Sequence, residues 1–64
     1  MRGELFTLPC LFKRETPNAV LVLDENTGEE IWFPISQVDS MHRDNDERGQ
    51  IIVSAWIAKQ KGLI

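Results

Sequence analysis

Apolar and polar side chains alternate along Glu29–Val38, the segment with the densest apolar run in the chain. Successive side chains of an extended segment point to opposite faces, so this alternation predicts a β-strand. One face is wholly apolar and suits a protein core; it comprises Ile31, Phe33 and Ile35. The other face carries a carboxylate, a large aromatic ring and a proline; it comprises Glu30, Trp32 and Pro34. Such a mixed face is unusual for a surface that meets only water.

The residues before this strand predict further extended segments. Ala19–Asp24 is almost continuously apolar and rich in β-branched side chains, which predicts a central strand covered on both faces. Glu25–Gly28 is a turn whose glycine can adopt positive φ, so the two strands are expected to form a hairpin. Leu5–Leu8 and Cys10–Glu15 predict an earlier strand. Pro9 between them has no N–H for a ladder and marks an edge, a bulge or an end.

The C-terminal part combines a polar stretch with a short helix. Asp39–Gly49 lacks hydrophobic periodicity and predicts a solvated, mobile loop. Gln50–Val53 predicts a short strand. Ser54 is a suitable N-cap for a helix over Ala55–Lys61, and Trp56 is expected to anchor this helix in the core.

These elements predict an α+β fold in a single small domain, residues 1–64. The expected architecture is an antiparallel β-meander of three to four strands with a short C-terminal helix. Two arrangements satisfy this pattern. The helix packs on the sheet in two layers, or the strands curl into a small barrel.

Composition and charge narrow the classes of function. The chain has 64 residues and a formal net charge of -3, which disfavours a protein that mainly binds phosphate backbones. Its single cysteine suits a reducing cytosol. No apolar run approaches the roughly 20 residues that span a bilayer, so we expect a cytoplasmic protein that does not act at a membrane.

Residues that carry catalysis or bind metals are sparse. Cys10 and His42 are each the single residue of their kind, too few ligands for a structural zinc site. Asp44 begins a stretch that invites comparison with a calcium loop. Its fifth position is Arg48 and its twelfth is Ala55, where the calcium loop requires a bidentate carboxylate. The chain also lacks a glycine-rich phosphate loop. We therefore expect no enzymatic activity, no cofactor and no metal site.

Two motifs resemble a group of small phage and prophage proteins. Trp32–Gln37 follows the pattern tryptophan, apolar, proline, any residue, serine, glutamine. Ala55–Leu63 resembles the tryptophan-bearing helix of this group, which ends in lysine, glycine and leucine. The resemblance extends from Glu15 to Ile64. It implies a phage- or prophage-encoded accessory protein in a bacterial host cell, in the context of early or recombination functions. It implies no particular activity.

The sharpest candidate site is a recognition strip that comprises Trp32, Pro34, Ser36 and Gln37. An aromatic platform flanked by hydrogen-bonding groups can stack on a base or hold a peptide. In the structural alternative, Trp32 covers the second face of the sheet or packs under the helix. Ser36 and Gln37 then only close strand ends.

Four cations form a second candidate set, which comprises Lys13, Arg14, Lys59 and Lys61. They form a basic patch beside Trp32 if the C-terminal helix lies near the end of the first strand. Otherwise they are scattered solubilising charges.

Three hypotheses about function follow. The first is a non-enzymatic interaction module that binds a protein partner from the host or the phage. The second is a single-stranded nucleic-acid-binding protein of phage replication or recombination, which requires an exposed Trp32 beside the cations. The third is self-association into a homodimer, because so small a core gains stability from an interface.

Overall fold

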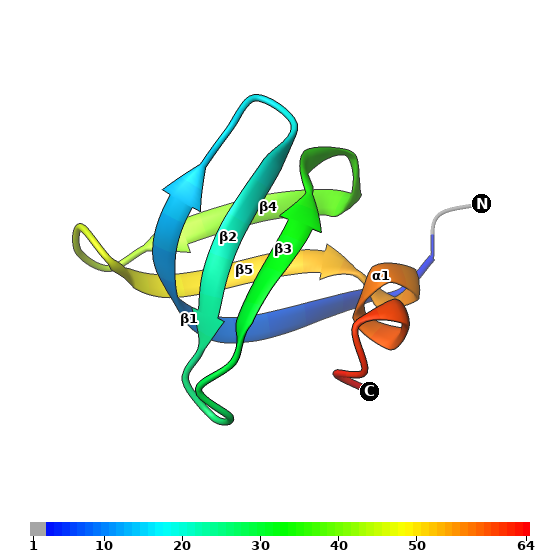
Figure 1. Cartoon of the computed structure of the whole chain (residues 1–64). Helices are drawn as coiled ribbons and strands as arrows, with labels where there is room; N and C mark the ends of the chain where they lie inside the picture. Colours follow the sequence, from blue (N-terminus) through cyan, green and yellow to red (C-terminus); the bar gives the residue numbers. More distant parts are fainter. Residues whose placement is uncertain (1–2) are drawn as a thin grey trace.

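The computed structural model describes residues 3–64, which form five β-strands, a 3-10 helix and one α-helix (Figure 1). In chain order these elements are β1 (Leu5–Glu15), β2 (Ala19–Asp24), β3 (Glu30–Pro34), η1 (Ile35–Gln37), β4 (Val38–Arg43), β5 (Arg48–Ser54) and α1 (Ala55–Gln60). The only α-helix of this part of the chain is too short to cross a membrane.

All five strands belong to one antiparallel sheet with the order β3-β2-β1-β5-β4. The long strand β1 is shared between two ladders. Its residues from Leu5 to Leu11 pair with β5, and its residues from Cys10 to Glu15 pair with β2. The sheet bends along β1, so β2 and β3 lie across β4 and β5 (Figure 1). The sheet is open, with β3 and β4 as its edges, and it has five strands rather than the three to four predicted.

The core lies between the two halves of the bent sheet and is closed at one end by α1. Its buried apolar side chains form one cluster, which comprises Leu8, Cys10, Phe12, Val20, Val22, Ile31, Phe33, Ile51, Val53, Ile57 and Ala58. The predicted apolar face of β3 supplies two of them, Ile31 and Phe33. Phe33 is the largest fully buried side chain of the domain.

The helix α1 begins where the sequence predicts. Its N-cap Ser54 accepts a hydrogen bond from the N–H of Ile57 at 3.2 Å, as its type and position suggest. Trp56 was predicted to anchor the helix in the core, and this is wrong, because the residue is 59% exposed. The helix is only six residues long and turns Ile57 and Ala58 towards the core. Because successive residues are about 100° apart around a helix, Trp56 points away from it.

The polar stretch predicted as a mobile loop is mostly strand. Val38–Arg43 forms β4 and pairs with β5, so only residues 44–47 form the connecting turn. This turn is ordered by Asn45, whose Oδ1 accepts hydrogen bonds from the N–H groups of Glu47 at 3.0 Å and Arg48 at 2.8 Å. β4 is an edge strand without a fully buried side chain. Polar side chains are common on such strands, and they conceal the hydrophobic periodicity.

β1 continues through Pro9, where the sequence allowed an edge, a bulge or an end. Pro9 pairs with Gln50 of β5, and the ladder with β2 begins only at Cys10. β1 therefore has one neighbouring strand at the proline, which suits a residue that cannot donate to a ladder.

Candidate functional site

The outward side chains of β1, β2 and β3 form a partly apolar surface that we call the tryptophan face. Val20 and Val22 of β2 are buried, whereas Leu21 and Leu23 between them are only half-buried. The prediction that this strand is covered on both faces is therefore wrong. The tryptophan face comprises Leu11, Lys13, Arg14, Ala19, Leu21, Leu23, Glu30, Trp32 and Pro34.

Trp32 lies opposite Leu21 on this face and is 43% exposed. Trp32 therefore lies over the outer face of the sheet, as the structural alternative also allows, but no helix covers the indole. Asn18 and Ile35 are three pairs away from Leu21 and Trp32 along the same ladder. They form a bonded pair, because the N–H of Ile35 donates to the carbonyl of Asn18 at 2.9 Å. Bonded and non-bonded pairs alternate in antiparallel ladders, so Leu21 and Trp32 form a non-bonded pair. Side chains approach most closely in such pairs, and the leucine thus supports the indole.

A β-bulge brings two of the four predicted cations to this face. The pairing of β1 with β2 shifts between Phe12 and Arg14, so Lys13 is the extra residue of the bulge. Arg14 lies opposite Leu21, which in turn lies opposite Trp32. Neighbouring strands are about 4.8 Å apart, so the backbone of Arg14 lies about 10 Å from that of Trp32. Lys13 and Arg14 thus lie on the face that carries Trp32.

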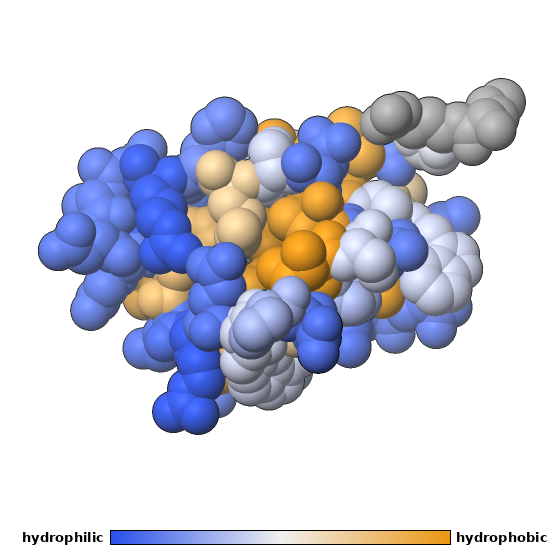
Figure 2. Space-filling view, turned by 90° about the horizontal axis from the view of Figure 1, so that it is seen from above, coloured by the Kyte–Doolittle hydropathy of each residue, from blue (hydrophilic) through white to orange (hydrophobic). Residues whose placement is uncertain are grey.

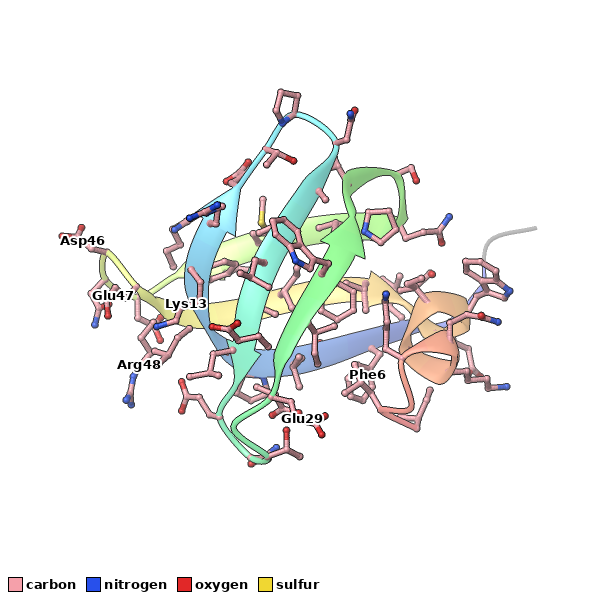
Figure 3. All side chains as sticks on the ribbon, in the orientation of Figure 1. Phe6, Lys13, Glu29, Asp46, Glu47 and Arg48 are labelled. Atoms are coloured by element: carbon pink, nitrogen blue, oxygen red, sulfur yellow. The ribbon has the colours of Figure 1, made fainter. Side chains whose placement is uncertain are left out.

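The other two predicted cations, Lys59 and Lys61, are not part of the same group. They lie at the end of α1. The first residue of this helix is held near the start of β1, because the N–H of Ala55 donates to the carbonyl of Glu4 at 2.7 Å. Lys13 lies beside the β4–β5 turn, at the other end of the molecule (Figure 3). The condition for a four-cation patch is therefore not met, because α1 packs near the start of β1 rather than near its end.

Ser36 and Gln37 leave the tryptophan face because the chain turns in η1. The Oε1 atom of Gln37 accepts a hydrogen bond from the hydroxyl of Ser54 at 2.7 Å. The same hydroxyl caps α1, so Gln37 links η1 to the start of the helix. Ser36 is exposed and lines a shallow hollow of about 170 Å³ with Leu5. The predicted strip is therefore divided, and only Trp32 and Pro34 share a face.

A second hollow lies at the end of β1, beside the β4–β5 turn, and we call it the basic hollow. Its volume is about 300 Å³, and its lining comprises Phe12, Lys13, Arg14, Glu15, Arg43 and Asp46. The N–H of Phe12 donates to the carbonyl of Glu47 at 2.6 Å, which holds the turn against the bulge. Seen from above, this end of the molecule is strongly hydrophilic and the middle is apolar (Figure 2).

Arg43 is fixed in the basic hollow by three contacts. Its guanidinium lies over the ring of Phe12, 4.3 Å from the centroid, and its Nη2 atom lies 3.3 Å from a carboxylate oxygen of Glu15. Its Nη1 atom donates to the carbonyl of Asp46 at 3.4 Å. Sequence reasoning missed this arginine because it fell in the predicted loop. No local signal places it near β1.

Cys10 and His42 lie on opposite sides of the sheet. Cys10 is fully buried, whereas His42 is exposed on β4 and pairs with Gln50. A Cys–His pair is thus not assembled. Burial is the main cause, and the negative charges of Glu25 and Asp24 contribute as well, of the rise in the pKa of the Cys10 thiol from 9.0 to about 11.

The raised thiol pKa predicts a loss of stability at alkaline pH. The unfolded chain releases the thiol proton near pH 9.0, but the folded chain holds it until about pH 11. The thiol's contribution is therefore complete below pH 9 and is lost as pH rises through about 11, at a cost of about 2–3 kcal/mol in the free energy of unfolding. Urea unfolding between pH 8 and 11 should show this fall. A Cys10→Ala variant with an equally steep fall would show that the thiol is not its cause.

Two surfaces thus stand out among residues 3–64: the tryptophan face and the basic hollow beside it, which share Lys13 and Arg14. Comparison of the chain with protein-family models, with curated proteins and with solved structures gave no match.

Proposed function

We propose that this chain is a non-enzymatic phage or prophage accessory protein that binds a protein partner through the tryptophan face. The observation that carries the proposal is the exposure of Trp32 in a row with Leu21 and Arg14. Tryptophan and arginine are enriched among residues that dominate binding energy at protein interfaces. The motif resemblance of Trp32–Gln37 supports the phage context, with the partner supplied by phage or host.

The surroundings of Trp32 favour a protein over a nucleic acid. The tryptophan face offers one aromatic ring, and its remaining apolar members are aliphatic or proline. Proteins that bind single strands usually stack successive bases on several aromatic rings in a positively charged groove. Here Glu30 lies on the same face, and the chain has a net charge of -3. Single-stranded nucleic acid remains the second candidate because Arg14 lies in the row of Trp32.

We expect Trp32→Ala to remove partner binding without unfolding the domain. An interface tryptophan of this kind contributes about 2 kcal/mol or more, so affinity should fall about thirtyfold. The measurement is recovery of a cross-linked partner from phage-infected host extract, with folding checked by circular dichroism. Trp56→Ala is the matched control, because it removes an equally large exposed indole from α1, outside the tryptophan face.

Two results would contradict the proposal. One is a folded Trp32→Ala variant that recovers the same partner as efficiently as the unchanged protein. The other is tight binding of a twelve-residue oligothymidylate at low salt that depends on Trp32, which would favour the nucleic-acid hypothesis. Sedimentation at high concentration tests the homodimer hypothesis in the same samples. A Trp32-dependent dimer would make a second copy the partner.

A further inference from the structure

The basic hollow is a local reversal of charge in an acidic chain. Its lining has three cations, Lys13, Arg14 and Arg43, and two carboxylates, Glu15 and Asp46, so its local net charge is +1. The whole chain carries -3. An anionic group is therefore attracted to the cations of the lining itself, although the neighbouring turn carries Asp44 and Glu47.

The three cations differ in what holds them. Arg43 is fixed by the ring of Phe12 and the carboxylate of Glu15, yet its side chain is 41% exposed. A guanidinium held in this way keeps N–H donors for a further acceptor and loses little freedom on binding. Lys13 and Arg14 form no ion pair with any residue in the described part of the chain. Their charges are available to a ligand.

The hollow and the tryptophan face share Lys13 and Arg14. Arg14 lines the hollow and also lies in the row that leads through Leu21 to Trp32. A partner that covers Trp32 can thus also reach Arg14 with an anionic group. The backbones of Arg14 and Trp32 lie about 10 Å apart, because two strand spacings separate them.

We propose that the basic hollow binds a carboxylate of the protein partner, so that the partner presents an acidic side chain as well as an apolar group for Trp32. This inference rests on the proposed function and specifies its partner. A carboxylate fits better than a phosphate backbone, because Glu15 and Asp46 repel a continuous chain of phosphates more strongly than one carboxylate.

Selection from a displayed library of random twelve-residue peptides tests this inference without knowledge of the natural partner. We expect the unchanged protein to select peptides that combine Asp or Glu with aromatic or aliphatic residues. A Lys13→Glu/Arg14→Glu variant should lose the acidic preference and bind the best acidic peptide about ten- to hundredfold more weakly. Binding of that peptide should also weaken as salt rises.

The matched control is a Lys59→Glu/Lys61→Glu variant, which makes the same change in net charge on α1. It should select acidic peptides as the unchanged protein does. If both variants lose acidic peptides equally, overall charge is responsible and the inference fails. Lys13→Gln/Arg14→Gln repeats the test with a smaller perturbation if the reversed charges impair folding.

The outcomes separate this inference from the proposed function. Selected peptides that depend on Trp32 but show no enrichment of Asp or Glu would overturn the carboxylate site and leave the interaction module intact. Peptides that bind Trp32→Ala as well as the unchanged protein would overturn both. Tighter binding of twelve-residue oligothymidylate than of any selected peptide would identify the hollow as a phosphate site and also overturn the inference.

Discussion

Replacing Phe33 by alanine is expected to unfold the domain at 25 °C. Phe33 is fully buried, and removal of a buried phenylalanine ring costs about 3–5 kcal/mol. A single core in a domain below about 70 residues rarely supplies more than 3–5 kcal/mol in total. The substitution therefore removes most or all of the stability. Circular dichroism and one-dimensional NMR of the purified variant measure the loss.

The neighbouring residue provides the control for this prediction. Trp32→Ala removes a larger ring one position earlier in β3, but a partly exposed one, so it should lower the midpoint of urea unfolding much less than Phe33→Ala does. The assignment of the two faces would be wrong if Trp32→Ala destabilised the domain as much as Phe33→Ala.

Replacing Gly49 by alanine is the second substitution with a large expected effect. A Cβ atom at Gly49 would overlap the carbonyl oxygen of His42 and lie 2.8 Å from the Cα atom of Arg43. Both neighbours are backbone atoms of β4, so the strand itself must move. Overpacking of this kind costs about 1–3 kcal/mol. We expect a lower urea midpoint and faster amide hydrogen exchange across β4.

Gly3→Ala is the matched control, because a Cβ atom there meets nothing within 4 Å. It should leave both measurements unchanged. If Gly49→Ala kept the original midpoint and exchange rates, the close approach of β4 to β5 at this position would not exist in solution. The same substitution should disturb the basic hollow, since Arg43 lies opposite Gly49.

Local pattern was sufficient for the elements that bury one clear face. β3 alternates over its whole length, and its inward residues Ile31 and Phe33 are buried as the alternation predicts. The hairpin before it follows from a glycine turn between two apolar segments, and Gly28 adopts a φ of +77° there. The N-cap Ser54 likewise predicts the start of α1, because capping depends on residues that are adjacent in sequence.

Local pattern failed where the outcome depended on which strands pair. β4 has polar residues because it lies at an edge, so its sequence looks like a loop until β5 is placed beside it. The positions of Lys59 and Lys61 depend on the β1–β5 ladder, which joins residues from opposite ends of the chain. Burial of Trp32 or Trp56 could not be read from periodicity, because each depends on which face another element covers.

In the candidate site, too, some features follow from local sequence and others depend on which strands pair. Trp32 and Pro34 share a face because they are two positions apart on one strand. Arg14 lies in the row of Trp32 because a bulge aligns it with Leu21. Arg43 lines the basic hollow because its guanidinium contacts the ring of Phe12 on another strand. Neither the bulge nor this cross-strand contact has a signature in the nearby residues.

The shared strand β1 has a consequence for the order of folding during synthesis. The β1–β2–β3 meander and the β4–β5 hairpin each join segments that are close in sequence, so they can form early. The ladder that unites them pairs Leu5 with Ser54, near the two ends of the chain. Closing so long a loop is slow, and it requires β5 to have left the ribosome. Until then the nascent chain exposes the half of its core that faces β5, so its risk of aggregation falls only when β5 pairs with β1.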